Sequence, residues 1–174
     1  MELSGQTFAT WYRAEHPRVL GALTALSGDG ELAAEVTDEA FARALARWAR
    51  VSQMDSPAGW THRVALNALR RRHRRRSTEA RALTSVGSRA GAAAEQPASH
   101  PEVWAAVRAL PEKQRVAIVL RYVADLPEAA IAETMGVSRG TVASNLSDAR
   151  RALAARLGEH APGTPPVENA EVPR

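Results

Sequence analysis

Residues 127–146 read PEAAIAETMGVSRGTVASNL, and this stretch is the most informative one about the fold. It predicts two helices joined by a short turn centred on Gly136, a residue that suits a backbone conformation with positive φ. Ala132 lies where the two helices must approach closely, and Val142 packs the second helix back onto Ile131. This spacing of a small residue, a glycine and an aliphatic residue is typical of a helix-turn-helix.

The second helix of a helix-turn-helix places its N-terminal residues in the major groove of DNA. Ser138 can cap this helix, and Arg139 could contact O6 and N7 of a guanine. The hydroxyls of Thr141 and Ser144 could hold phosphates. The candidate DNA-binding residues are Ser138, Arg139, Gly140, Thr141, Ala143, Ser144 and Ser147. The alternative interpretation is an ordinary helical hairpin in an all-α core.

A dense basic run occupies residues 67–77, NALRRRHRRRS, although the net charge of the 174-residue chain is only +4. No acidic residue occurs between Asp55 and Glu79. Such a local patch favours docking of a polyanion. A solvated helix end is the alternative. A targeting signal is disfavoured because the run continues a patterned helix.

The apolar residues recur at three- and four-residue steps, which predicts an all-α protein of two small helical domains. We expect the first domain at residues 1–77, a flexible linker at 78–100, the second domain at 101–158 and a disordered tail at 159–174. Within the first domain, one helix is predicted to bury Leu32, Val36, Ala40, Phe41, Leu45 and Trp48. Another is predicted to begin at Pro57, with Ser56 as its cap.

Several classes of function are disfavoured by the composition. The chain has no cysteine, which excludes disulfides, thiolate zinc sites and cysteine nucleophiles. The five histidines show no spacing of metal ligands, and no nucleophile motif occurs. We therefore expect no enzyme, no catalytic residue, no cofactor and no metal site. The N-terminal residues lack the apolar core of a signal peptide and no run is long enough to span a membrane, so we expect a cytoplasmic protein.

Residues 110–153 resemble region 4 of the extracytoplasmic-function (group 4) sigma factors of bacterial RNA polymerase. The resemblance rests on four pieces, namely Leu110-Pro111-x-x-Gln114-Arg115, Leu120-Arg121-Tyr122, Ile131-Ala132 and Gly140-Thr141-Val142. Residues 33–48 and 59–75 resemble region 2 of the same family, through Trp60, Arg63, Val64, Ala65 and Asn67. The two matches stand in the family's order with a linker between them. The resemblance thus implies a sigma factor that directs core polymerase to specific promoters.

The resemblance also implies roles for individual residues. Region 2 would engage the −10 element and region 4 the −35 element of promoter DNA. The loop at residues 51–56 would hold an unstacked −10 base, because a pocket can offset the cost of melting. The −10 residues would be Ser52, Gln53, Met54, Asp55, Arg63, Asn67, Arg70, Arg71, Arg72, Arg74 and Arg75. Trp48 and Trp60 are interpreted as core residues rather than as base-stacking platforms.

Polymerase would dock on the helix matching residues 35–47. Glu35, Asp38, Glu39 and Arg43 are the residues expected to contact the β′ clamp, and the β flap is the second expected polymerase contact. An anti-sigma factor is a further possible partner. A merely amphipathic exposed face is the alternative for this helix.

Some residues depart from the family's pattern. Ala143 stands where a basic residue often contacts phosphate, and Asp148 would repel a phosphate. These departures, together with a composition rich in alanine and arginine, resemble the divergent actinobacterial members. A stand-alone helix-turn-helix regulator is the alternative function, but it would need a dimer, and no apolar heptad seam is visible to supply one.

Overall fold

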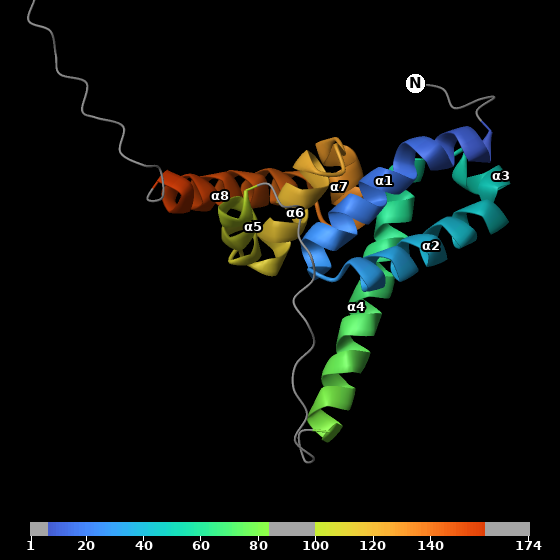
Figure 1. Ribbon diagram of the computed structural model, residues 1–174. Helices are drawn as coiled ribbons and strands as arrows, with labels where there is room; N and C mark the ends of the chain where they lie inside the picture. The colour runs from blue at the N-terminus through green and yellow to red at the C-terminus, as the bar shows by residue number, and fades with distance from the viewer. Residues whose placement is uncertain (1–6, 84–99, 159–174) are drawn as a thin grey trace, which may run out of the picture.

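The structure, a computed structural model, describes residues 7–83 and 100–158, which form eight α-helices. The first domain holds α1 (Phe8–Ser27), α2 (Gly30–Ala46), α3 (Trp48–Val51) and α4 (Pro57–Leu83). The second domain holds α5 (Pro101–Arg108), α6 (Glu112–Tyr122), α7 (Glu128–Met135) and α8 (Arg139–Gly158) (Figure 1). The predicted all-α fold is confirmed. The expected tail and most of the expected linker lie outside the described residues.

The first domain is built on a hairpin of α1 and α2 closed by aromatic side chains. Gly28 ends α1 in the left-handed conformation (φ 67°), and the Asp29 side chain caps α2 by accepting a hydrogen bond from the Leu32 amide at 2.8 Å. Trp11 is buried, with its ring 5.2 Å from that of Phe41 and 4.8 Å from that of Trp48. Trp48 begins α3 instead of continuing the helix of Leu32 and Phe41 as expected, but it is half-buried and packs against the core, in agreement with its interpretation as a core residue.

One residue of the predicted core is placed wrongly. Leu45 is 57% exposed, although it was expected on the buried side of α2. Phe41 and Ala44, three residues apart, fill the buried side of the last turn instead. Leu45 follows Ala44 by one residue, which is about 100° around the helix, and it therefore lies outside the buried side.

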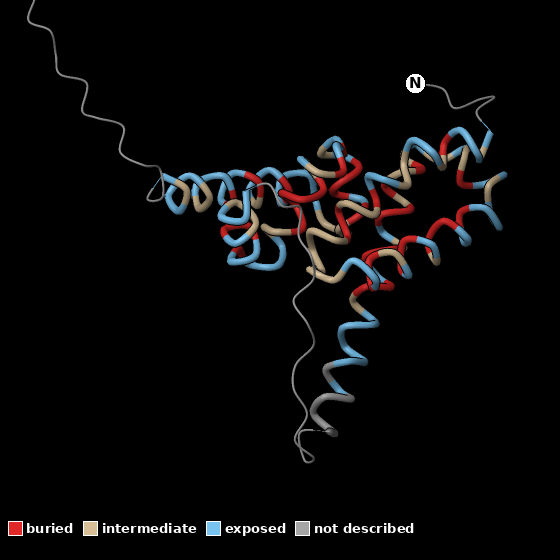
Figure 2. Tube along the Cα trace, in the orientation of Figure 1, coloured by how far each residue is buried: buried red, intermediate tan, exposed pale blue. Residues whose placement is uncertain are grey.

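The long helix α4 begins as expected and continues beyond the expected domain boundary. The Gly59 amide donates to Ser56 Oγ at 3.0 Å, so Ser56 is the cap and Pro57 occupies the first turn. The helix runs to Leu83, past the boundary expected at residue 77. Its C-terminal part projects from the bundle as a single helix (Figure 1), and residues 71–76 are exposed there (Figure 2). The arginine run thus lies on a projecting helix.

The second domain packs α6, α7 and α8 around buried aliphatic residues. Leu120, Ile131, Val142 and Leu146 are fully buried. The turn between α7 and α8 contains Gly136 with φ 67°, as the sequence predicts. Within the described ranges, no helix combines the length and apolar character needed to cross a membrane.

The two domains are in direct contact. Helix α7 packs on the first turns of α4, and α6 packs on α1. A side chain at Gly21 of α1 would place its Cβ 3.6 Å from Val123 Cγ1, which follows α6. The buried apolar residues of both domains therefore form one continuous cluster.

Candidate nucleic-acid interfaces

The N-terminal turns of α8 form an exposed face on a rigid base. The Thr141 amide donates to Ser138 Oγ at 3.1 Å, which confirms Ser138 as the cap of this helix. Val142 and Leu146 face the core. The other predicted −35 residues lie together on the exposed side of the helix, namely Arg139, Gly140, Thr141, Ala143, Ser144 and Ser147. The exposed face therefore has the position that the sequence analysis predicts for a recognition helix.

The polar groups on this face differ in what they already contact. Ser144 Oγ donates to the Gly140 carbonyl at 3.2 Å, and Thr141 Oγ1 lies 2.9 Å from Ser138 Oγ. These hydroxyls would have to leave partners within their own helix to donate to phosphate. Arg139 is exposed and forms no ion pair with any other described residue. It is the long donor on this face that remains available.

Asp148, expected to repel phosphate, has a partner in the structure. Arg151 Nη2 lies 2.6 Å from Asp148 Oδ1, one helical turn away on α8. The pair is exposed and offsets part of the negative charge beside the recognition face. The local charge at this point is therefore less unfavourable than the sequence indicates.

The loop between α3 and α4 borders a cavity of about 340 Å³. Gln53, Met54 and Asp55, three of the residues predicted to bind −10 DNA, line it. Ser52 is not among the lining residues; its amide donates to the Trp48 carbonyl at 2.9 Å. The remaining lining residues are Ser56, Gly59, Trp60, Arg63 and, from the second domain, Glu133.

Trp60 contributes both to the core and to this cavity. Its side chain is half-buried and packs against the apolar cluster, as interpreted from the sequence, and another part of it lines the cavity. The sequence analysis did not predict that Trp60 lines the cavity. Helical spacing predicts which side of a residue faces the core, but a partly buried indole is large enough to border both environments.

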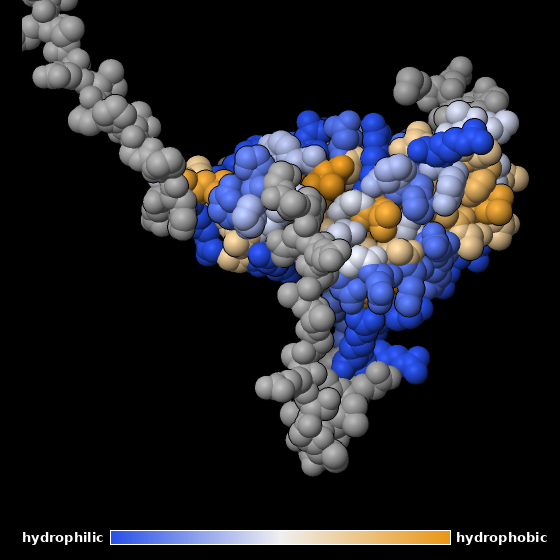
Figure 3. Space-filling model, in the orientation of Figure 1, coloured by the Kyte–Doolittle hydropathy of each residue, from blue (hydrophilic) through white to orange (hydrophobic). Residues whose placement is uncertain are grey.

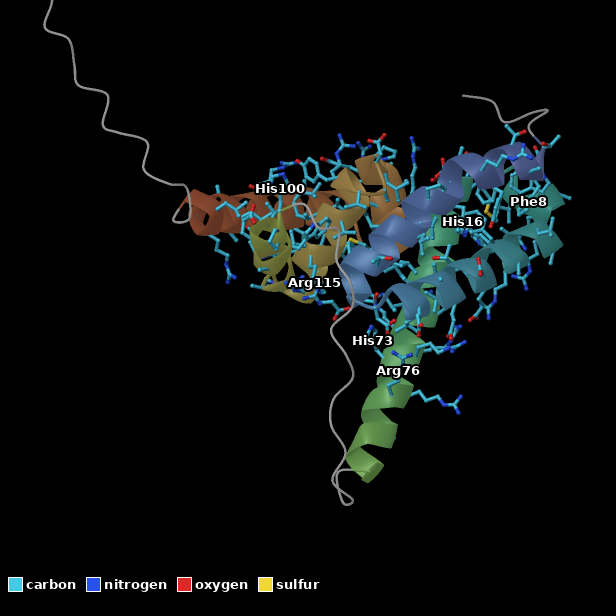
Figure 4. All side chains as sticks on the ribbon, viewed as in Figure 1. Phe8, His16, His73, Arg76, His100 and Arg115 are labelled. Carbon is cyan, nitrogen blue, oxygen red and sulfur yellow. The ribbon has the colours of Figure 1, made fainter. Side chains whose placement is uncertain are left out.

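The arginines of α4 pair with carboxylates of α2. Arg71 Nη2 lies 3.0 Å from Glu39 Oε1, and Arg72 Nη1 lies 2.8 Å from Glu35 Oε2. A third pair joins Arg76 to Asp29, the residue that caps α2, at 2.7 Å. Figure 3 shows hydrophilic residues covering the projecting part of α4, and Figure 4 labels His73 and Arg76 there. Residues predicted to bind −10 DNA are thus in contact with residues predicted to bind polymerase.

These ion pairs would compete only weakly with a polyanion for the arginine side chains. The Arg71 and Arg72 side chains are 49% and 47% exposed, and exposed pairs contribute little free energy because water and salt screen them. Arg70 is different, since it reaches Glu112 of the second domain at 3.3 Å. Arg74 is exposed and forms no ion pair with another described residue, and Asn67 and Arg75 are also exposed.

The predicted polymerase-binding face of α2 is only partly open. The Asp38 side chain is 70% exposed and lies 3.4 Å from His16 Nε2. The Glu39 side chain is 27% exposed, because Arg43 contacts it at 2.6 Å and Arg71 contacts it from α4. Asp38 is therefore the most accessible carboxylate of this face, while Glu39 is the most engaged.

An apolar groove on the second domain was not found from the sequence. It has a volume of about 320 Å³ and is bordered by Trp104, Ile118, Tyr122 and Leu153. Tyr122 is 61% exposed, and its hydroxyl accepts a hydrogen bond from Arg150 Nε at 2.9 Å. The sequence signal that could have indicated this groove is the spacing of the apolar residues 103, 104 and 107 in α5. This spacing leaves one apolar side of the helix uncovered.

His62 is buried in the first domain in its neutral form. Burial lowers the pKa of His62 from 6.5 to about 4, against a smaller raising effect of the hydrogen bond to the Ala58 carbonyl. Its Nδ1 lies 3.1 Å from that carbonyl oxygen, and its Nε2 has no partner among the described residues. A charge on this ring would oppose folding.

Comparison with known proteins covers both domains. The family model for Sigma-70 region 2 matches residues 11–79, and that for Sigma-70 region 4 matches residues 100–153. A chain of the co-crystal structure of the sigma factor RpoE with the anti-sigma factor NepR from Bartonella quintana superposes with a TM-score of 0.73. The match covers 87% of this chain and 96% of that chain, at 21% sequence identity. At that identity the likeness establishes the fold.

The two regions, in this order and covering both domains, define a transcription initiation factor. The chain belongs to the sigma-70 family and carries its regions 2 and 4, as sigma factors of the extracytoplasmic-function type do. It is a sigma factor, which binds RNA polymerase and promoter DNA and is not an enzyme. The regulator hypothesis has no support, because the first domain also belongs to this family.

Proposed function

We propose that region 4 reads the −35 element through the N-terminal face of α8. The observation that supports this most directly is Arg139, an exposed guanidinium at the start of a helix whose opposite side is fixed by Val142 and Leu146. In this position it can form two hydrogen bonds to a guanine. Gly140 and Ala143 leave room for DNA to approach closely. Ser138, Thr141, Ser144 and Ser147, exposed on the same side of the helix, would contact the DNA backbone.

Region 2 is proposed to hold an unstacked −10 base in the cavity bordered by Gln53, Met54 and Asp55. The amide and carboxylate can pair with the Watson–Crick edge of a base, and the Met54 side chain offers an adaptable apolar surface. Ser52 would act on the loop rather than on the base, because it does not line the cavity. The polar residues of α4 would follow the DNA backbone from there, namely Arg63, Asn67, Arg70, Arg71, Arg72, Arg74 and Arg75.

Two surfaces are proposed to bind core polymerase. The face of α2 with Glu35, Asp38, Glu39 and Arg43 would dock on the β′ clamp, with Asp38 as its most exposed carboxylate. The apolar groove beside Tyr122 would receive the β flap, because an open apolar groove of this size favours an apolar partner segment. Because the protein would act on RNA polymerase, its proposed site of action is the cytoplasm.

The subtype and an additional partner are also proposals. The departures at Ala143 and Asp148, with a composition rich in alanine and arginine, support a divergent actinobacterial type of extracytoplasmic-function sigma factor. The similar RpoE was crystallised with the anti-sigma factor NepR. By analogy, an anti-sigma factor is proposed to control this chain as well.

Transcription with core polymerase on genomic fragments tests this function. The purified protein is expected to co-purify with core and to make core start at a limited set of sites. A control without the protein should give none of these starts. Tight binding to a palindromic duplex without any effect on core would contradict the proposal.

A further inference from the structure

A basic cavity lies where α4 of the first domain meets the start of α6 of the second. It has a volume of about 550 Å³, and three arginines, one histidine and one glutamate line it together with apolar side chains. With the histidine neutral, these charged groups leave an excess of positive charge. Figure 4 labels two of the basic residues, one from each domain. The charged and titratable lining residues are Arg70, His73, Arg74, Glu112 and Arg115.

Two of the arginines keep their charge without an acidic partner among the described residues. Arg115 Nη1 donates to the carbonyl oxygens of Arg108 at 3.0 Å and Leu110 at 3.3 Å. These neutral acceptors fix the Arg115 guanidinium in place but do not cancel its charge. Arg74 is exposed and forms no ion pair with another described residue. Two such cations at one cavity favour a ligand that carries more than one negative charge.

The carboxylate at this cavity is partly neutralised. Glu112 lies 3.3 Å from Arg70 Nη2, so each charge offsets part of the other. Glu112 is also the first residue of α6, an 11-residue helix that has no side-chain cap at its N-terminus. The dipole of a helix favours an anion at this end. The helix start thus adds to the attraction of the arginines.

Apolar side chains line the same cavity beside the arginines. Leu66, Leu69 and Val116 belong to the buried core, and Leu26 packs against it. An apolar surface next to fixed cations suits a ligand with an apolar ring and a compact charged chain. A nucleoside di- or triphosphate has this chemistry, because its charges lie on adjacent phosphates. A DNA strand carries one charge for each nucleotide and spreads its charges along the chain.

We propose that this cavity binds one nucleoside di- or triphosphate, with its phosphates on Arg74 and Arg115 and its base against the apolar side chains. Binding of the nucleotide needs neither promoter nor polymerase. The bound phosphates would occupy Arg74 and lie beside Arg70, two residues that the proposed function gives to −10 DNA. The nucleotide would therefore compete with DNA, and this consequence rests on the proposed function.

Calorimetric titration of the full chain with ATP tests the site. The buffer contains no divalent cation, so ATP alone is the probe. ATP should bind once per chain with a Kd below about 1 mM. Inorganic triphosphate should bind at least roughly threefold more weakly, because it has no apolar ring to bury. Absence of saturable ATP binding, or equal binding of ATP and inorganic triphosphate, would overturn the proposal.

Arginine variants distinguish this cavity from general attraction to the basic run. Arg74→Ala should weaken ATP binding by at least roughly fivefold, because a charge-assisted hydrogen bond is lost. Arg75→Ala is the matched control: it removes the same charge from the next residue of α4, which does not line the cavity. This control should weaken ATP binding by less than roughly twofold. Equal losses in the two variants would mean that the whole run attracts ATP, and the proposed site would be refuted.

Removal of the carboxylate should have the opposite effect. Glu112→Gln should strengthen ATP binding by roughly threefold to tenfold, because the change removes a repulsive charge and releases Arg70. Damage to the fold would weaken binding, so a gain separates the electrostatic effect from a structural one. Glu133→Gln removes the same charge at a residue that does not line this cavity, and it should have little effect. Unchanged or weaker ATP binding in Glu112→Gln would contradict the proposed site.

Competition tests the overlap with DNA. Saturating ATP should weaken binding of the full chain to a pool of single-stranded deoxyoligonucleotides by at least roughly threefold, compared with sodium chloride at the same ionic strength. Equal DNA binding in ATP and in sodium chloride would refute the overlap. If the chain bound no DNA even at low salt, the proposed DNA-binding role of these arginines would fail. The calorimetric result would still decide whether the nucleotide site exists.

Discussion

The Arg71 guanidinium lies 3.0 Å from the Glu39 carboxylate and so joins α4 to α2. This pair connects a residue proposed to bind −10 DNA to a residue proposed to bind polymerase. Binding of DNA phosphate to Arg71 would release Glu39 from one of its arginine partners. The two proposed surfaces are therefore adjacent and share charges.

Asp38 offers the cleanest test of the polymerase face. Asp38→Lys should weaken binding to core polymerase, because this carboxylate is 70% exposed and does not pair with α4. Reversing Glu39 as well should weaken it further, but it would also disturb Arg71. Affinity for core is measured by titration, and circular dichroism checks the fold. Glu31→Lys is the control on the same helix, and an equal loss in that variant would argue against a defined docking face.

The arginines of α4 should differ in how much they contribute to the salt dependence of promoter binding. Arg74 forms no ion pair with another described residue, whereas Arg71 is partly neutralised by Glu39. Arg74→Ala should lower the slope of log affinity against log salt by about 1, if it contacts one phosphate in the holoenzyme–promoter complex. Arg71→Ala should lower it less. The slopes are measured on one promoter across a salt series, and the reverse order would refute this ranking.

The loop before α4 should determine the preferred −10 base. Replacing Gln53, Met54 and Asp55 by the corresponding loop of another family member should change the −10 preference, because these side chains border the cavity. Ser52→Ala is the matched control, since Ser52 is in the same loop but does not line the cavity. Transcription from a promoter library provides the measurement. An unchanged −10 preference would leave the loop as a connector.

Buried His62 should make folding sensitive to acid. Its pKa is about 4 in the folded protein and 6.5 when unperturbed, so the unfolded chain binds the proton more readily. The contribution of neutral His62 to the free energy of unfolding is therefore fully present above about pH 6.5. It falls by up to about 3 kcal/mol as the pH falls toward 4. Denaturant unfolding at several pH values measures this. In His62→Gln the free energy of unfolding should depend less on pH over this range. An unchanged pH dependence in this variant would contradict the role of His62.

Local sequence signals predicted much of the fold. Gly136 and Ser138 act within a few residues of their own position, so the turn and the cap could be recognised from the chain alone. Leu45 was misplaced because a spacing of three and one of four both fit a helix face, and only the packing of Ala44 decides between them.

Contacts between distant segments could not be predicted. Nothing in the residues around Glu133 shows that it borders a cavity formed by residues 53–63, because that contact depends on how two domains pack. The pairing of Arg72 with Glu35 likewise needs the spatial relation of α4 and α2. The sequence analysis predicted the DNA-binding and the polymerase-binding residues as separate groups. The structure brings residues of these two groups into contact.

Transcription by core polymerase from a promoter library, with wild-type protein and Arg139→Ala, tests the two-domain account most directly. Arg139→Ala should cost roughly 1–3 kcal/mol of preference for the −35 element, while −10 preference and core binding stay unchanged. Ser147→Ala, at the far end of the same face, should cost less. Unaltered −35 preference, or equal loss of −35 and −10 preference, would contradict separate reading by the two domains.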